Sequence, residues 1–184
     1  MLVCEDILNF NASAYGLKPS AYKIIANIPY NITGAILKKF LSATHQPKLM
    51  VLMVQHEVAK RIVGRGSNPS TPLRVKESIL SVSVKAYGVP KLIMKVDKRY
   101  FSPAPKVDSA IISIKNISRK IFEESKINEE KFWEIVKKGF AHKRKKLSSN
   151  LKSLEKYRIV TPADGLGNKR AEDLALSDWI ALAK

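Results

Sequence analysis

The sequence has 184 residues, 45% of them hydrophobic, and a formal net charge of +17 from 33 Lys and Arg against 16 Asp and Glu. This length allows one ordinary domain or two small ones, and the apolar share is enough for a core, which argues against wholesale disorder. A charge excess of this size suggests a polyanionic partner, because each phosphate that a protein neutralises releases counterions. A merely soluble basic protein is the plainer alternative.

Cysteine and histidine are scarce. The single cysteine, Cys4, excludes an internal disulfide and a cysteine-based zinc site, and three scattered histidines argue against a metal cluster. The longest apolar run, Leu49 to Val54, is too short to cross a bilayer. No signal peptide is visible, because Glu5 and Asp6 follow the start almost at once. We therefore expect a cytoplasmic monomer that uses neither a metal nor a membrane.

The first part of the chain, to about residue 116, predicts an alternation of strands and helices. The expected strands are at 23–26, 49–54, 92–96 and 107–114, and the expected helices at 34–42 and 55–63. The continuous apolar run at 49–54 is typical of a strand buried on both faces of a parallel sheet. Glycine, proline and serine predict a loop at 64–72. The stretch 79–86 alternates like a strand but also permits a helix, and its sequence leaves that open.

Composition changes after about residue 116, and a small helical domain of about four helices is expected over residues 117–184. Asn128 followed by two glutamates predicts a capped helix start, with Phe132 and Val136 on an apolar stripe behind it. Further helices are expected at 147–154, from Thr161-Pro162 and from Ser177. The predicted fold class is therefore α/β at residues 1–116 followed by an all-helical part.

Asn27-Ile28-Pro29-Tyr30 is the most informative tetrapeptide. It follows a predicted strand, so it should lie at a strand's carboxyl end, where α/β sheets bind ligands. An Asn oxygen and a backbone carbonyl can accept the two N–H groups of an exocyclic amine, which suits methylation of that nitrogen. Pro29 holds residue 28 extended, and Tyr30 offers a face on which a flipped base can stack. A strand-ending turn that happens to hold Asn and Pro is the alternative.

Five blocks spread over the chain resemble the KsgA-type family of small-subunit ribosomal RNA adenine dimethyltransferases, which use S-adenosylmethionine. They are Asn27 to Ile32, Val54 to Ile62, Phe101 to Ser109, Phe140 to Leu147, and Arg170 to Leu174. The resemblance implies dimethylation of adenine amines in small-subunit rRNA during ribosome biogenesis. The related large-subunit methylase of macrolide resistance fits less well, because it lacks the C-terminal marks. DNA adenine methylases usually carry Pro in place of Ile28.

The resemblance also implies roles for single residues. Asn27 and a carbonyl beside Pro29 would hold the target amine, Tyr30 and Phe101 would lie on the two sides of the base, and Asp6 with Asn27 would contact the cofactor. RNA phosphates would meet Lys98, Arg99 and Lys106 beside the pocket, and Lys143, Arg144, Lys145 and Lys146 on a basic helix. The plainer alternatives are a core aromatic for Phe101, a solvated acid for Asp6 and a solvated helix face for the basic run.

Family members open with a cofactor-binding segment, a strand and a glycine-rich turn, none of which this sequence contains. Gly64-Arg65-Gly66 is the only Gly-x-Gly outside the tail, and no strand is expected before it. The sequence therefore resembles the C-terminal part of a Rossmann-like methyltransferase domain followed by a helical RNA-binding domain at 117–184. We expect a bared sheet edge, exposed apolar surface and weak binding of S-adenosylmethionine. An rRNA-binding module without turnover is the alternative function.

Overall fold

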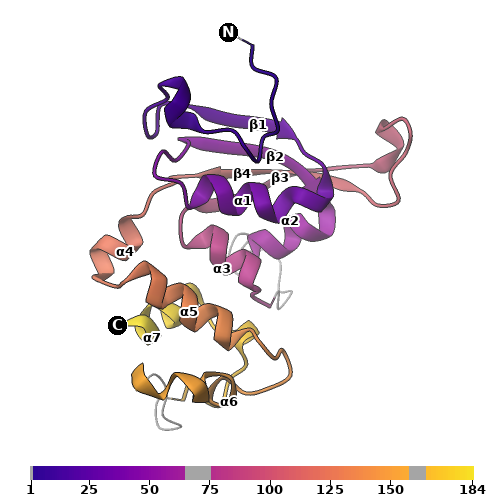
Figure 1. The fold of residues 1–184 in the computed structure, drawn as a ribbon. Coiled ribbons are helices and arrows are strands. Elements are labelled where there is room, and N and C mark those ends of the chain that lie inside the picture. The colour runs from indigo at the N-terminus through magenta and orange to yellow at the C-terminus, as the bar shows by residue number, and fades with distance from the viewer. Residues whose placement is uncertain (1, 65–75, 158–164) are drawn as a thin grey trace.

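The computed structural model describes residues 2–64, 76–157 and 165–184. A four-stranded sheet in the order β1-β2-β4-β3 forms the first part of the molecule, and helices form the second (Figure 1). The strands are β1 (Lys23–Asn27), β2 (Leu49–Gln55), β3 (Val89–Val96) and β4 (Ser109–Lys115). The α-helices are α1 (Thr33–Leu41), α2 (His56–Val63), α3 (Ile79–Lys85), α4 (Lys120–Ser125), α5 (Glu129–Gly139), α6 (Leu147–Leu151) and α7 (Leu176–Ala183).

The sheet is mixed. β1 pairs with β2 in parallel, whereas β4 lies antiparallel between β2 and β3. Fully buried and half-buried residues alternate along β2. The expectation of a strand buried on both faces of a parallel sheet was therefore wrong. The physical reason is that α1, α2 and α3 lie together on one side of the sheet, so the other face has no helical layer among the described residues (Figure 1).

The covered face of the sheet carries its core. The register places Met50 beside Ile114 and Leu52 beside Ile112, and all four side chains are fully buried. The apolar stripe of α1 belongs to the same core cluster. Burial of one such side chain is worth about 1.5–3 kcal/mol, so this face is the main source of stability for the sheet.

The opposite face is apolar but open. Ile25 of β1 pairs with Val51 and Asn27 pairs with Met53 on this face, and the Ile25 side chain is 74% exposed. β1 is also an edge strand of the described sheet. The expected bare edge and exposed apolar surface are both present.

Helix α5 begins as predicted. The side chain of Asn128 accepts the Lys131 amide at 2.9 Å, and Phe132 and Val136 are buried. Its last residue, Gly139, lies so close to the Trp179 ring of α7 that a Cβ there would collide with it. Trp179 is fully buried, so this contact joins the first and last long helices of the helical part.

Several other expectations have clear outcomes. The ambiguous stretch 79–86 is helical, because Ser78 and Ser81 form a reciprocal cap at its start. The helix expected at 147–154 is α6 to Leu151 and then a 3-10 helix from Lys152. The loop predicted at 64–72 and the helix start at Thr161 lie outside the described residues, apart from Gly64. A domain boundary near residue 116 stays a prediction.

Within residues 2–64, 76–157 and 165–184, no helix has the length and apolar character needed to cross a membrane. The same residues hold no group of three or more His, Cys, Asp or Glu side chains placed to bind a metal ion.

Candidate functional site

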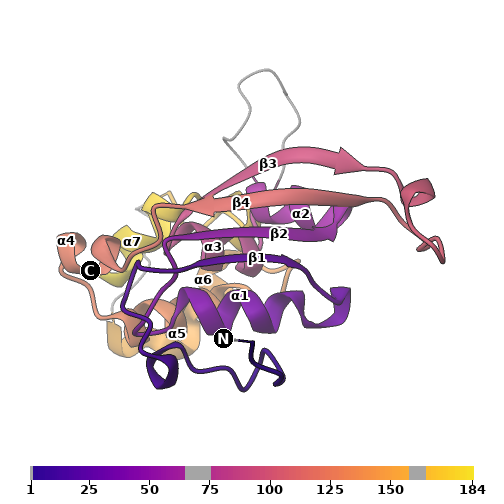
Figure 2. The same ribbon diagram turned by 90° about the horizontal axis from the view of Figure 1, so that it is seen from above.

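The predicted base-binding residues lie at one end of the sheet, which is called its edge below and is distinct from the edge strand β1. β1 and β2 end there, and Gln55 at the end of β2 pairs with Ser109 at the start of β4. Ser109 in turn pairs with Val96 at the end of β3. The connection from β3 to β4 therefore leaves from this edge, and Figure 2 shows it extending past the ends of the strands.

The Asn27-Ile28-Pro29-Tyr30 corner is anchored by its second residue. Ile28 is only 6% exposed, whereas Asn27 before it is exposed at the end of β1. Pro29 has φ −58° and ψ 131°, and its carbonyl accepts the amide of Ile32 at 3.2 Å in the following 3-10 helix. This geometry keeps the Asn27 side chain outside the core, where a ligand can reach it.

Tyr30 contacts the third family block, Phe101 to Ser109, which lies far away in the sequence. Its hydroxyl lies 2.6 Å from Oγ of Ser109, and the Ser109 side chain is fully buried. This hydrogen bond fixes the Tyr30 ring against the start of β4. Sequence reasoning placed Ser109 in the block but gave it no role, because nothing local indicates a partner 79 positions away.

Asp108 organises the connection between β3 and β4. Its carboxylate accepts the Lys98 amide at 3.1 Å and pairs with the Lys95 ammonium at 2.7 Å, while its carbonyl accepts the His56 amide at 3.0 Å. The hydrogen bond from Lys95 and then that from the Lys98 amide lower the pKa of Asp108. The same carboxylate raises the pKa of Lys95. These contacts hold both ends of the connection close to α2.

Two aromatic residues stand next to each other in this connection. Phe101 is half-buried, and no ring contact joins it to Tyr30 in the described part of the chain. Tyr100 is 70% exposed, with the Arg99 guanidinium 5.1 Å from its ring centroid and donating to its hydroxyl at 3.2 Å. An exposed aromatic beside a cation suits base stacking. Sequence reasoning missed Tyr100, although its place between Arg99 and Phe101 was a usable signal.

Three basic side chains meet beside this connection. His56, Lys98 and Lys106 line a cavity of about 310 Å³ together with the two acids Glu57 and Asp108. Desolvation by burial, followed by the charges of Lys60 and Lys95, lowers the pKa of His56. Lys98, Arg99 and Lys106 are all exposed. Lys98, Arg99 and Lys106 therefore supply positive charge at the same end of the sheet as Asn27, beside the carboxylates of Glu57 and Asp108.

The basic run Lys143 to Lys146 lies in the turn between α5 and α6, so the expectation of a basic helix was wrong. The reason is a buried amide. The side-chain nitrogen of Asn150 donates to the carbonyls of Gly139 at 2.7 Å and His142 at 3.1 Å, which ends α5 and holds the turn. All four basic residues, Lys143, Arg144, Lys145 and Lys146, are exposed on it.

Asp6 lies in the segment before β1 and is exposed. Its carboxylate accepts the Leu8 amide at 2.8 Å, and its carbonyl accepts the amides of Asn9 and Phe10. Lys39 of α1 donates to the Leu8 carbonyl at 2.9 Å, which ties this turn to the helix. No contact between Asp6 and Asn27 is found in the described residues.

In the described residues, the block Arg170 to Leu174 makes contacts that stabilise the fold. Glu172 pairs with Lys76, and its carbonyl accepts the Glu77 amide at 2.9 Å. Ala171 and Leu174 are buried. This block therefore fastens the C-terminal tail to the start of α3.

Two solved structures share the fold. A dimethyladenosine transferase from Plasmodium falciparum has a TM-score of 0.71 at 22% identity, covering 97% of this chain and 69% of that chain. The 23S rRNA methyltransferase ErmE has a TM-score of 0.62 at 24% identity, covering 96% and 68%. The chain therefore has the Rossmann-like fold of these two structures. This chain covers about two thirds of each of the two chains, with a mixed sheet followed by a small helical part.

A family model described as ribosomal RNA adenine dimethylase matches residues 1–184. The ribosomal RNA small subunit methyltransferase A of Dehalococcoides mccartyi is 35% identical over 184 residues, which cover 97% of this chain and 60% of the relative. The protein of the same name from Rippkaea orientalis is 39% identical over 167 residues, covering 86% and 58%. The chain belongs to the ribosomal RNA adenine dimethylase family, and it spans about 60% of the length of these curated relatives.

Proposed function

We propose that the protein dimethylates the exocyclic amines of adenines in small-subunit ribosomal RNA, using S-adenosylmethionine, in the cytoplasmic compartment where subunits assemble. The family supports the reaction class, and the relatives named above support the small subunit as the target. The observation that carries the proposal is the exposed Asn27 at the sheet edge, beside a corner fixed by Pro29 and by the bond between Tyr30 and Ser109.

The proposed role of the corner is to hold the target amine. The oxygen of Asn27 and the carbonyl of Ile28 accept its two N–H groups, because the Pro29 carbonyl already accepts the Ile32 amide. This arrangement draws the nitrogen lone pair away from the base ring and toward the methyl donor. Tyr30 and Phe101 cover the two faces of the base. The methylated nitrogen loses its proton to water, so no strong base is required.

S-adenosylmethionine, when bound, supplies an electrophilic methyl carbon. The chemistry of Asp6 fits it in part: one carboxylate oxygen caps the Leu8 amide, and a carboxylate has further lone pairs for an adenine amine. The sequence holds no glycine-rich turn for the rest of the cofactor. We therefore expect the 184-residue chain to bind S-adenosylmethionine very weakly, so the methyl-transfer test below uses the cofactor at millimolar concentration. Micromolar binding in calorimetric titration would contradict this expectation.

The proposed RNA contacts use two exposed basic clusters. Lys98, Arg99 and Lys106 flank the base site, and Lys143 to Lys146 occupy the turn after α5. Such cations position a backbone without reading sequence, so the target would be selected by RNA shape and an extruded loop base. Affinity should then fall steeply with salt.

The test is methyl transfer to immature small subunits by the wild-type protein and by Asn27→Ala and Asn27→Asp variants. Loss of the amide oxygen in Asn27→Ala should lower turnover by about 10²–10³, the usual effect of removing one positioned hydrogen-bonding group. RNA affinity and thermal stability should stay unchanged, because the Asn27 side chain is exposed. Equal turnover by wild type and Asn27→Ala would overturn the proposal. Tight RNA binding with no turnover by wild type would favour the binding-module alternative.

A further inference from the structure

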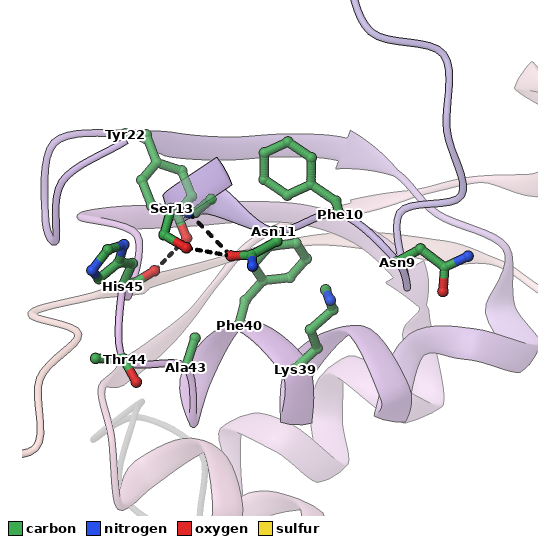
Figure 3. Close-up of a pocket in the computed structure, with 11 residues that line it drawn as sticks. Asn9, Phe10, Asn11, Ser13, Tyr22, Lys39, Phe40, Ala43, Thr44 and His45 are labelled. Carbon is green, nitrogen blue, oxygen red and sulfur yellow. Dashed lines mark hydrogen bonds between the residues drawn. The ribbon is translucent and has the colours of Figure 1, made fainter. Parts of the chain in front are cut away.

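A second cavity lies near the opposite end of β1 from Asn27. It has a volume of about 610 Å³ and is formed between residues 9–13, Tyr22 and the C-terminal end of α1 with residues 43–45 (Figure 3). Tyr22 precedes β1 and Asn27 ends it, so the two positions are about 16 Å apart at the rise of a strand. None of the residues proposed above for base, cofactor or RNA lines this cavity.

The walls of the cavity are aromatic. Phe10 and Tyr22 come from the segment before β1, and Phe40 comes from α1 (Figure 3). Phe10 stacks on Tyr15 at 5.3 Å with an interplanar angle of 6°, and its centroid lies 6.3 Å from that of Phe40. These rings form a rigid surface that suits a flat apolar ligand, and the volume is that of a small-molecule site, typically about 300–1,000 Å³.

Two side chains bring hydrogen-bond donors to this surface. The side-chain oxygen of Asn11 accepts from the amide of Ser13 at 3.1 Å and from its hydroxyl at 2.9 Å. These bonds turn the Asn11 oxygen toward Ser13 and leave its NH₂ group for another partner (Figure 3). Lys39 donates to the Leu8 carbonyl at 2.9 Å and keeps two further N–H groups.

His45 adds an unsatisfied polar atom. Its Nδ1 is buried and has no hydrogen-bond partner among the described residues, although its backbone carbonyl accepts the Tyr22 hydroxyl at 2.6 Å. A buried polar atom without a partner costs about 1–3 kcal/mol. His45 contributes to the cavity through its backbone carbonyl, which holds the Tyr22 ring in the wall.

We propose that this cavity binds a nucleotide. The aromatic walls take the base, the NH₂ group of Asn11 donates to an acceptor on its edge, and the Lys39 ammonium meets the phosphate. The ligand is either a free mononucleotide or one nucleotide of a single-stranded RNA. The inference does not depend on methyl transfer, because it uses none of the residues assigned to that reaction.

The first experiment titrates the purified protein with AMP and with adenosine by calorimetry. AMP should bind at least tenfold more tightly, because adenosine cannot use the Lys39 charge. Lys39→Met should abolish this preference. Lys38→Met is the matched control, since Lys38 is exposed on α1 and does not line the cavity. Equal binding of AMP by both variants would overturn the proposal, as would no saturable binding of AMP or RNA at millimolar concentration.

A second variant guards against loss of the fold in Lys39→Met. Asn11→Asp keeps the oxygen that caps Ser13 but places a carboxylate beside the ligand, so AMP affinity should fall at least tenfold at an unchanged melting temperature. Unchanged affinity would count against the site. Asp6→Asn should leave AMP binding intact, whereas a loss there would assign the nucleotide to the cofactor site and overturn the inference.

A short single-stranded oligoadenylate identifies the source of the nucleotide. If RNA is the natural ligand, the oligonucleotide binds more tightly than AMP and is weakened by Lys39→Met. If a free nucleotide is the ligand, AMP binds more tightly than the oligonucleotide. Both outcomes support the site, and neither bears on whether Asn27 is needed for methyl transfer.

Discussion

The two faces of the sheet differ sharply although the same four strands build both. On the covered face Ile112 and Leu52 are fully buried beneath α1 to α3. On the other face Ile25 is 74% exposed, and Met94 on β3 is 53% exposed. Apolar residues on both faces mean that the pattern along the strands suits a sheet covered on both sides. The described residues supply only one of the two layers.

The difference separates stability from function in this molecule. The covered face holds the strands in register, and the register in turn brings Asn27, Tyr30 and Ser109 to one edge. The open face contributes little to the fold of the described chain, because its side chains still contact water. Substitutions should therefore act very differently on the two faces.

The largest effect on the free energy of unfolding is expected when an isoleucine of the covered face is truncated, compared with the same change on the open face. Ile112→Ala should lower the free energy of unfolding by about 2–5 kcal/mol, because it opens a cavity in the covered core. Ile25→Ala should change it by less than about 0.5 kcal/mol. Urea denaturation followed by circular dichroism measures both. Similar losses for the two variants would mean that something covers the open face in solution.

The next effect concerns two asparagines of the helical part. Asn150→Ala should cost about 1–3 kcal/mol, because it strips the donor from the buried carbonyl of Gly139 and also frees that of His142. Asn168→Ala is the matched control, since Asn168 is exposed and, among the described residues, its side chain accepts from the Lys146 ammonium alone, at 3.1 Å. It should cost less than about 0.5 kcal/mol.

The Asn150→Ala variant also tests the proposal that the turn after α5 binds RNA. Asn150→Ala should weaken RNA binding, because the turn that presents Lys143 to Lys146 loses its buried anchor. Filter binding at several salt concentrations measures this. An RNA affinity equal to that of the wild type would show that the order of the turn is irrelevant to binding.

The sequence was sufficient to predict features that depend on interactions between neighbouring residues. The cap of α5 depends on Asn128 and its immediate neighbours, and the corner at Pro29 follows directly from β1, so both could be predicted. The helix at 79–85 was ambiguous by periodicity, and the reciprocal bonds of Ser78 and Ser81 decide it.

Prediction from the sequence failed for features that depend on contacts between residues far apart in the chain. The basic run looked helical because lysine and arginine favour helices, yet Asn150 draws the carbonyls of Gly139 and His142 into a turn. The partner of Tyr30 lies 79 positions away and depends on strand order. The mixed sheet likewise depends on where β4 inserts, which no window of the sequence contains.

A smaller effect should appear at the edge where the covered core meets the site. Ser109→Ala and Tyr30→Phe should each cost about 0.5–1.5 kcal/mol, and the double variant should cost no more than either alone, because both remove one hydrogen bond. Tyr100→Phe is the control, since in the described part of the chain its hydroxyl meets only the exposed Arg99. Additive costs in the double-mutant cycle would mean that the two hydroxyls act separately.

The smallest effect on stability is expected from the ion pair between Lys95 and Asp108, at the same end of the sheet. The Lys95 ammonium lowers the pKa of Asp108, so the folded state favours the ionised carboxylate. This stabilisation is full above about pH 4, the ordinary pKa of Asp, and is lost as pH falls through the lower folded value. Melting temperatures of wild type and Asp108→Asn should therefore differ at pH 6 and converge toward pH 2. Because solvent screens this partly exposed pair, the difference should be smaller than for Ser109→Ala. A gap that persists unchanged at pH 2 would assign the effect to the amide and backbone contacts of Asp108 rather than to its charge.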